Sequence, residues 1–412
     1  MADKGGLLAR SEFPLYVVKA LDERHFLVAG GGGAAKTGIA NAIEIYEVKI
    51  QDGKLQAVSI CRHDTGSQAI MNGTNVYDGR NHHFAAGLDD ECHVYSLKYK
   101  VVSPKKKTSD DGNLRQRKKG DSNPDNTPNS TGKKIMFEID KVKSTKTDFN
   151  KDSSFQKVAQ ISPNRSFIAT GGTDGYLRVW KFPGLEKSFE VHGHKNDIDD
   201  IDISPPGDKI VTVSRDHCAC VWNSKDGSKI TDLKWPLQSD EHRYRCCRYG
   251  LIEGKKDKYN LYTISIPTKR SAQKPLPCFV TMWNSEKFTP KLMVNAGTEV
   301  LSSLALSDDG VYLAVGTISG SVAVYISFSL QKLYYKKEAH SIFVTGIEFM
   351  PSSEGTREVT GNQDFTLLSI SADNTIRMHQ VAARNSYSVL LIVFGALLIV
   401  LMLFVMLGEY GI

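Results

Sequence analysis

The sequence feature that most constrains the fold is a repeated pattern whose clearest copies lie 42 residues apart. Small residues and a turn with Asp or Gly precede an alternating strand that ends in an aromatic residue, as in ATGGTDGYLRVW and VTVSRDHCACVW. These two copies end at Trp180 and Trp222, which are 42 positions apart, and the same 42 positions separate Trp283 from Tyr325. This spacing is typical of a four-stranded propeller blade, so the pattern predicts sheets that stack around an axis.

Weaker copies of the pattern end at Tyr46, Tyr95 and His379, which brings the number of predicted blades to seven. A single blade cannot bury both faces of its sheet, so the blades have to stack on one another and the two ends of the ring have to meet. We therefore expect an all-β propeller over residues 1–380, with the first dozen residues supplying the outer strand of the last blade.

The copy that ends at Trp222 carries a second marker. A Gly-His pair places His194 28 residues before Trp222, and Asn223 follows where an Asp is usual. This copy resembles the WD-repeat family, which implies a seven-bladed WD-repeat β-propeller. His194, Ser214 and Asp216 are also the residue types of a hydrolase triad, but no GxSxG elbow accompanies them. In similar WD repeats the His, the turn Asp, the strand Ser and the Trp form a buried hydrogen-bond network, so we expect a structural role.

Charge is unevenly distributed along the chain. The net charge is +6, from 52 Lys and Arg against 46 Asp and Glu, and residues 100–134 alone hold ten basic and four acidic side chains. The rest of the chain is therefore balanced, and a basic surface that binds nucleic acid is not expected. Residues 100–134 have almost no large apolar residue after Val102 and predict a disordered insertion. We interpret it as a solvated loop. The alternatives are attraction to anionic headgroups and a nuclear-localisation or nucleic-acid patch, of which membrane attraction is favoured over contact with DNA.

The C-terminal region predicts a single membrane-spanning helix. Residues 388–407 (SVLLIVFGALLIVLMLFVML) carry no charge and would form about 30 Å of helix, the thickness of a hydrocarbon core. Arg377 and Arg384 precede this segment and Glu409 follows it, so the positive-inside rule places the large N-terminal part in the cytosol. Residues 381–387 are then a juxtamembrane linker, and residues 408–412 are a short tail on the far side.

A glycine-rich stretch, GGGGAAKTG over residues 30–38, follows a predicted strand over residues 25–29. It is similar to a phosphate-binding loop, but Ala35 stands where that loop needs a glycine, and a strand over residues 42–50 follows instead of a helix. Nucleotide hydrolysis is therefore not expected. A plain flexible hairpin loop is one interpretation. The other is a functional loop, because four consecutive glycines cost chain entropy and allow carbonyls to meet a cation or the backbone to approach a partner closely.

Four segments together carry a closer resemblance: GGGGAAKTGIAN, TDFNKDSSFQKVA, FSLQKLYY and the apolar C-terminal run. The chain resembles the prolactin regulatory element-binding proteins, the animal exchange factors of the endoplasmic reticulum for the small GTPase Sar, which start COPII coat assembly. The resemblance implies a protein of the endoplasmic reticulum membrane with its propeller in the cytosol and its C-terminus in the lumen. The implied partners are a Sar-type GTPase, COPII coat components and the membrane, and no nucleic acid. Exchange of this kind involves no covalent chemistry.

The resemblance also implies the working residues. The glycine-rich loop would be ordered around a potassium ion and would insert at the nucleotide site of the GTPase. By position in the matching motif, Asn41 and Ile39 are expected to contact the GTPase and displace nucleotide, with Lys36 and Thr37 next in importance. The potassium ligands would be backbone carbonyls of Gly30, Gly31, Gly32 and Gly33.

Two other functions remain open at this point. A membrane-anchored scaffold could collect coat proteins without exchange activity, and variants of the glycine-rich loop would separate that function from exchange. The family name also suggests a promoter-binding regulator, against which the balanced charge of the propeller and the apolar C-terminal segment argue.

Overall fold

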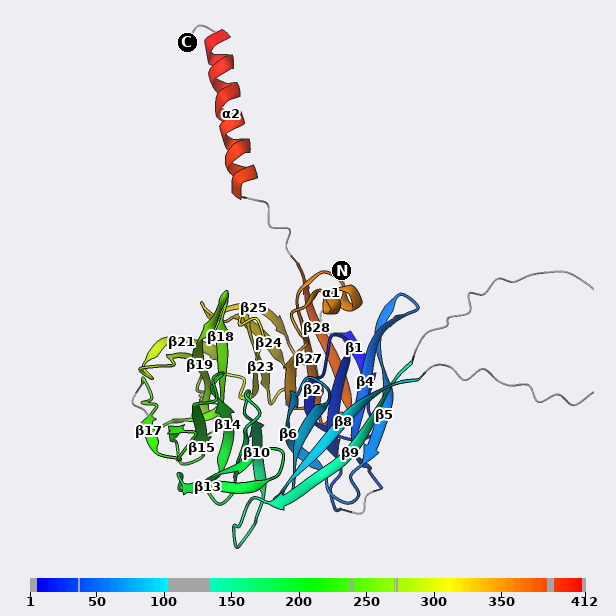
Figure 1. The fold of residues 1–412 in the computed structure, drawn as a ribbon. Coiled ribbons are helices and arrows are strands. Elements are labelled where there is room, and N and C mark those ends of the chain that lie inside the picture. The colour runs from blue at the N-terminus through cyan, green and yellow to red at the C-terminus, as the bar shows by residue number, and fades with distance from the viewer. Residues whose placement is uncertain are drawn as a thin grey trace, which may run out of the picture.

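The computed structural model describes residues 6–35, 38–102, 134–237, 240–269, 271, 273–383 and 389–409. Within these residues, 28 strands form seven four-stranded antiparallel sheets, each of which is one blade (Figure 1). The innermost strand of every blade contacts the innermost strand of the next, and those of the first and last blades also contact each other. The blades therefore close into the seven-bladed ring that the repeat predicts.

Each of the first six blades consists of four consecutive strands that follow one another from the inside of the ring outwards. The first blade contains β2 (Leu15–Ala20), β3 (His25–Gly31), β4 (Asn41–Gln51) and β5 (Lys54–Asp64). The second contains β6 (Ile70–Tyr77), β7 (His82–Leu88), β8 (Glu91–Val102) and β9 (Lys134–Lys146). The third contains β10 (Gln156–Ile161), β11 (Phe167–Gly172), β12 (Tyr176–Lys181) and β13 (Glu186–His192). The fourth blade contains β14 (Ile198–Ile203), β15 (Lys209–Ser214), β16 (Ala219–Asn223) and β17 (Lys229–Asp232). The fifth contains β18 (His242–Ile252), β19 (Lys255–Pro267), β20 (Cys278–Asn284) and β21 (Pro290–Gly297). The sixth contains β22 (Leu301–Leu306), β23 (Tyr312–Thr317), β24 (Val322–Ile326) and β25 (Gln331–Lys336).

The last blade combines the two ends of the propeller. It contains β26 (Val344–Phe349), β27 (Gln363–Ser371), β28 (Thr375–Ala382) and, as its outer strand, β1 (Gly6–Arg10). β1 runs antiparallel to β28, with Gly6 opposite Met378 and Arg10 opposite Thr375. The prediction that the first dozen residues complete the last blade is confirmed.

The aromatic or His residue that ends each sequence repeat always lies on the third strand of a blade. These residues are Tyr46, Tyr95, Trp180, Trp222, Trp283, Tyr325 and His379, on β4, β8, β12, β16, β20, β24 and β28. All seven are at most 5% exposed. The repeat therefore marks one structural position, where a large ring fills the space between neighbouring sheets.

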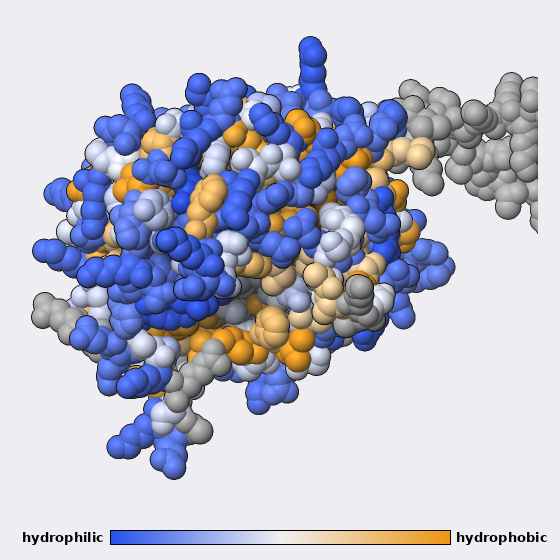
Figure 2. Space-filling view, turned by 90° about the horizontal axis from the view of Figure 1, so that it is seen from below, coloured by the Kyte–Doolittle hydropathy of each residue, from blue (hydrophilic) through white to orange (hydrophobic). Residues whose placement is uncertain are grey.

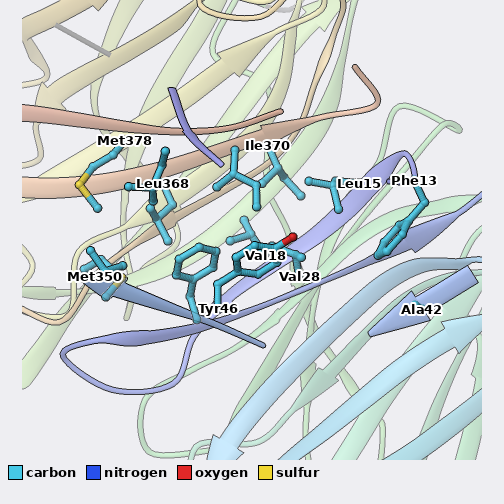
Figure 3. Close-up of a cluster of buried hydrophobic side chains, with 14 of the residues drawn as sticks. Phe13, Leu15, Val18, Val28, Ala42, Tyr46, Met350, Leu368, Ile370 and Met378 are labelled. Carbon is cyan, nitrogen blue, oxygen red and sulfur yellow. The ribbon is translucent and has the colours of Figure 1, made fainter. Parts of the chain in front are cut away.

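The hydrophobic core is divided into clusters, most of which join two neighbouring blades. Figure 3 shows the cluster at the closure of the ring, where Leu15 and Val28 of the first blade lie against Leu368, Ile370 and Met378 of the last. Burial of a large aliphatic side chain contributes about 1.5–3 kcal/mol, so this cluster stabilises the closure together with the β1–β28 hydrogen bonds.

Two helices accompany the strands. α1 (Glu354–Thr360) connects β26 to β27, and the hydroxyl of Ser353 caps its N-terminus by accepting from the Thr356 N–H. α2 (Val389–Glu409) is rich in apolar residues, many of them exposed. Among the residues that the structure describes, no helix was found to be both long and apolar enough to cross a membrane. The predicted span over residues 388–407 stays a prediction.

The predicted insertion over residues 100–134 begins and ends within strands. β8 runs to Val102 and β9 starts at Lys134, and these two residues lie opposite each other in the sheet. Residues 103–133 lie outside the described residues.

Candidate functional site: the glycine-rich loop and its face

The residues that resemble a hydrolase triad form a buried network. His194 lies within hydrogen-bond distance of the Thr212 hydroxyl through Nε2 (2.7 Å) and of the Asp216 carboxylate through Nδ1 (3.1 Å). The Trp222 indole N–H donates to the same Thr212 hydroxyl at 2.8 Å. The predicted structural role of His194, Asp216 and Trp222 is confirmed, but the strand hydroxyl is that of Thr212. Ser214 instead donates to the Asn196 carbonyl, because it lies two residues further along β15 at the end of the strand.

The last blade contains a variant of this network. His340 Nε2 and His379 Nε2 both lie within 2.8 Å of the Ser369 hydroxyl, and the Tyr334 hydroxyl is 2.9 Å from His379 Nδ1. Burial lowers the pKa of His340 to about 4 and that of His379 to about 3. Both rings are therefore neutral at pH 7, which suits hydrogen bonding between strands and does not suit proton transfer at that pH.

The glycine-rich loop connects β3 to β4, the second and third strands of the first blade. A strand follows it, as predicted, so no helix N-terminus faces the loop as a phosphate-binding loop requires. Asn41, the first residue of β4, is 5% exposed. Its Oδ1 accepts from the Gly33 N–H at 2.8 Å, and its Nδ2 donates to the Gly66 carbonyl at 2.9 Å and to the Gly33 carbonyl at 3.4 Å. One buried amide thus ties the loop to the turn that leads into the second blade.

Two of the glycines are required by close packing within the chain. A Cβ on Gly30 would lie 1.9 Å from the Pro14 carbonyl oxygen, which also accepts the Gly31 N–H at 2.9 Å. Gly31 has φ +143°, and a Cβ there would lie 2.1 Å from Asn41 Oδ1. Any side chain at these positions would displace Pro14 or Asn41, so both glycines set the position of the loop.

The four glycines fit the predicted potassium ion only in part. Gly30 and Gly31 belong to β3, while Gly32 and Gly33 lie in the loop. Successive carbonyls of a strand point to opposite sides, so Gly30 and Gly31 cannot both face one ion. The backbone carbonyls that could still ligate one ion are those of Gly32, Gly33 and one of the two strand glycines. In the described part of the chain, no group of three or more His, Cys, Asp or Glu side chains is placed to hold a metal ion.

The other predicted site residues divide between the loop surface and the undescribed part of the loop. Ile39 is 41% exposed, so its apolar side chain is available to a partner. Lys36 and Thr37 lie outside the described residues. The structure therefore gives Asn41 and Ile39 different positions, with Asn41 inside the base of the loop and Ile39 on its surface.

The loop lies on one side of the propeller, which we call the loop face. It holds the connection between the second and third strands of each blade and the connections between successive blades. Figure 2 shows this face, with hydrophobic residues gathered beside a hollow near its middle. Large apolar side chains that are 39–53% exposed on this face are Ile39, Met71, Phe149, Leu237, Ile342 and Phe343. Met71 and Phe343 line one cavity on this face, which offers apolar surface to a partner.

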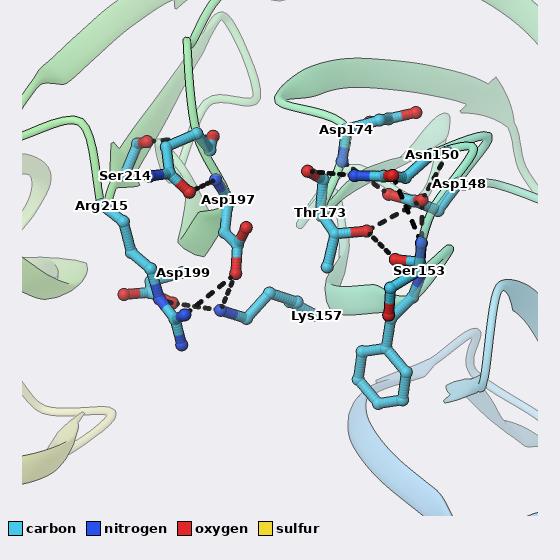
Figure 4. A network of polar contacts seen from close by, with 12 residues as sticks. Asp148, Asn150, Ser153, Lys157, Thr173, Asp174, Asp197, Asp199, Ser214 and Arg215 are labelled. Carbon is cyan, nitrogen blue, oxygen red and sulfur yellow. Dashed lines mark hydrogen bonds and ion pairs between the residues drawn. The ribbon is translucent and has the colours of Figure 1, made fainter.

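A polar network holds one of these residues in place. The buried Asp148 carboxylate accepts from the backbone N–H groups of Asn150 and Asp174 and from the Thr173 hydroxyl (Figure 4). The connection between β9 and β10 is thereby fixed, and Phe149 is presented 53% exposed with the Arg178 guanidinium 4.9 Å from its ring centre. The sequence indicated this segment only through its resemblance to a known family. Its hydrogen-bond partners, Thr173 and Asp174, come from the next hairpin, so no local pattern predicts these contacts.

The chain was compared with known proteins. Residues 148–181 and 185–223 match the WD40 family, described as WD domain, G-beta repeat. The Raptor structure from Chaetomium thermophilum superposes with a TM-score of 0.62 at 12% identity, covering 93% of this chain and 29% of Raptor, and supports the fold alone. SEC12-like protein 2 of Arabidopsis thaliana is 24% identical over 57% of this chain and 54% of its own.

Two mammalian relatives match over almost the full length. The guanine nucleotide-exchange factor SEC12 of Mus musculus is 36% identical over 415 residues, which cover 97% of this chain and 97% of the mouse protein. SEC12 of Rattus norvegicus is 36% identical with the same coverage of both chains. Each match spans nearly the whole of both chains, and this chain therefore belongs to the family of the guanine nucleotide-exchange factor SEC12.

Proposed function

We propose that the protein is a guanine nucleotide-exchange factor for a Sar-type small GTPase, anchored in the endoplasmic reticulum membrane, and that it starts COPII coat assembly there. The observation that carries this proposal is the 36% identity to mammalian SEC12 over 97% of the chain. The loop face supports it, because a positioned glycine-rich loop and exposed apolar side chains occur on the same side of the ring.

Exchange requires no covalent step. The factor has to bind the nucleotide-free GTPase more tightly than the nucleotide-bound form, and only that difference shifts the equilibrium. A thousandfold faster release needs about 4 kcal/mol of such a difference. In this proposal Asn41 holds the loop in one conformation and Ile39 makes an apolar contact at the nucleotide site. A loop that is ordered beforehand loses less entropy on binding, so more of the contact energy favours the nucleotide-free complex.

A potassium ion is part of this proposal. The loop carbonyls of Gly32 and Gly33, with one carbonyl of Gly30 or Gly31, would hold it, and the ion would order the loop further. Lys36 and Thr37, which precede Gly38 in the sequence, would be the next residues to contact the GTPase.

The test is release of a labelled guanine nucleotide from a purified Sar-type GTPase by the full chain in detergent micelles. We expect release to accelerate in proportion to the concentration of the protein, and to be slower when sodium replaces potassium. Equal rates with both ions would exclude the potassium site while leaving exchange intact. No acceleration with either ion would contradict the exchange function and favour the scaffold.

We also propose that α2 is the membrane anchor, with the propeller in the cytosol. Asn164 lies in an exposed turn and begins an Asn-Arg-Ser acceptor sequence that would be glycosylated only in the lumen. Translation in the presence of microsomes should leave Asn164 unmodified, and an acceptor sequence appended after Ile412 should be glycosylated. A glycan on Asn164, or none on the appended sequence, would contradict this orientation.

A further inference from the structure

The loop face contains a cavity of 590 Å³ at the mouth of the central channel. We call it the channel-mouth pocket. Its walls include Arg215 from the β15–β16 turn, Arg243 and Arg245 from the start of β18, and the apolar side chains of Ile318 and Phe343. These residues belong to different blades, so only the closed ring brings them together.

The arginines belong to a cluster of ion pairs around one buried carboxylate. Asp199 lies 2.5 Å from Lys157 and from Arg243, 3.2 Å from Arg215 and 3.7 Å from Arg245. Its side chain has no exposed surface. Burial alone would raise the pKa of Asp199, but the charges of Arg245 and Lys157 outweigh that effect and lower it to about 2. Asp199 is therefore ionised throughout the physiological pH range.

The cluster contains more positive than negative charge. Asp197 pairs with Lys157 and Arg215, as Figure 4 shows, so four cations meet two carboxylates. The neighbouring pair of Arg248 and Asp200 is neutral as a unit. Each guanidinium has five N–H donors in a fixed plane, and two carboxylates cannot accept from all of them. Three of the four cations, Arg215, Arg243 and Arg245, line the pocket, and the 48% exposure of the Arg215 side chain leaves it accessible.

The pocket is linked to the glycine-rich loop through the first blade. Tyr16 and Thr345 line the pocket, and the Thr345 hydroxyl donates to the Leu15 carbonyl at 2.7 Å. The preceding carbonyl, that of Pro14, accepts from Gly31 at the base of the loop. A partner that reaches the loop is thus brought to the same face and close to the pocket.

We propose that the channel-mouth pocket binds an acidic segment of the GTPase, as a second contact beside the glycine-rich loop. Carboxylates of that segment would accept from Arg215 and Arg245, and neighbouring apolar residues would lie against Phe343 and Ile318. Charge complementarity of this kind speeds association and fixes orientation more than it changes the step after binding. The inference rests on the proposed function and names a contact that the glycine-rich loop does not provide.

The test compares Arg215→Glu with Lys225→Glu in full-length protein reconstituted in phosphatidylcholine vesicles. Lys225 is exposed on the turn between β16 and β17, at the opposite end of the same blade, so the two variants change the net charge equally. We expect Arg215→Glu to raise the KM for the GTPase about tenfold with little change in kcat, and Lys225→Glu to match wild type. The effect of Arg215→Glu should shrink as salt is raised, because salt screens the attraction.

A reciprocal experiment identifies the partner residues. Single Asp→Lys and Glu→Lys variants of the GTPase surface are assayed with Arg215→Glu, and at least one should restore its KM towards the wild-type value. Arg245→Gln is the second variant if Arg215→Glu melts at a lower temperature than wild type. Wild-type KM for both arginine variants, equal loss with Lys225→Glu, or no restoring variant would overturn the inference. Absence of exchange by the wild type would instead contradict the proposed function.

Discussion

Replacement of Asn41 by alanine is expected to slow nucleotide release by about tenfold to a hundredfold. The variant removes the acceptor of the Gly33 N–H and the donor to the Gly66 carbonyl. Each such bond contributes about 0.5–1.5 kcal/mol, and 1.36 kcal/mol corresponds to a factor of ten in rate. The loop would then sample many conformations. The entropy lost on ordering it would offset part of the favourable free energy of contact with the GTPase. The measurement is release of labelled nucleotide at a temperature well below the melting transition.

Three further variants separate positioning of the loop from contact with the GTPase. Asn41→Asp keeps an acceptor for Gly33 but cannot donate to Gly66, so it should recover part of the rate if the Gly33 bond is the important one. Ile39→Ala leaves both bonds intact and should slow exchange by removing apolar contact. Ile230→Ala, at a similarly exposed isoleucine on the outer strand β17, is its matched control. Wild-type exchange by Asn41→Ala and Ile39→Ala together would show that the loop is not the working element.

Replacement of Trp222 by alanine is expected to lower the free energy of unfolding by about 3–5 kcal/mol, as truncation of a large buried aromatic residue does. Trp222 is 3% exposed and packs directly on Gly193, where a Cβ would lie 2.6 Å from the indole. Its loss also leaves the Thr212 hydroxyl without the indole donor. Denaturant unfolding of the full chain measures the change.

Trp222→Phe is the matched comparison, because it keeps a ring and loses the indole N–H. We expect a smaller loss, about 1–2 kcal/mol, from the missing hydrogen bond and the reduced volume. Exchange per folded molecule should equal wild type in both variants. A folded Trp222 or His194 variant without exchange activity would mean that this network contributes to the working surface.

The sequence predicted the parts of the fold that repeat. The aromatic or His residue recurs once in every blade because each blade presents it at the same place on the third strand, and the predicted pairing of the two ends followed from the need to cover the last sheet. The strand hydroxyl of the buried network was predicted wrongly. Thr212 and Ser214 lie on the same face of β15, and the pairing of Thr212 with Cys220, two residues before Trp222, decides which of them meets the indole.

Features that depend on closure of the ring could not be predicted from the sequence. Asp199 and Arg243 are 44 residues apart, and no local pattern indicates that they meet. The glycine-rich loop was recognisable from its composition. Nothing in the composition showed, however, that Asn41 would turn inward to Gly33 and Gly66 while Ile39 remained on the surface.

Pairing of β1 with β28 also determines how the propeller would respond to mechanical load. β28 is the strand nearest α2 in the chain, so a pull on the C-terminal segment would reach the propeller through it. β28 is flanked by β1 on one side and β27 on the other, so it is not an edge strand. Force applied to its end has to break the hydrogen bonds to two neighbours, whereas an edge strand would peel away from one. If α2 anchors the protein in a membrane, as we propose, the propeller would therefore resist unravelling from its tethered end.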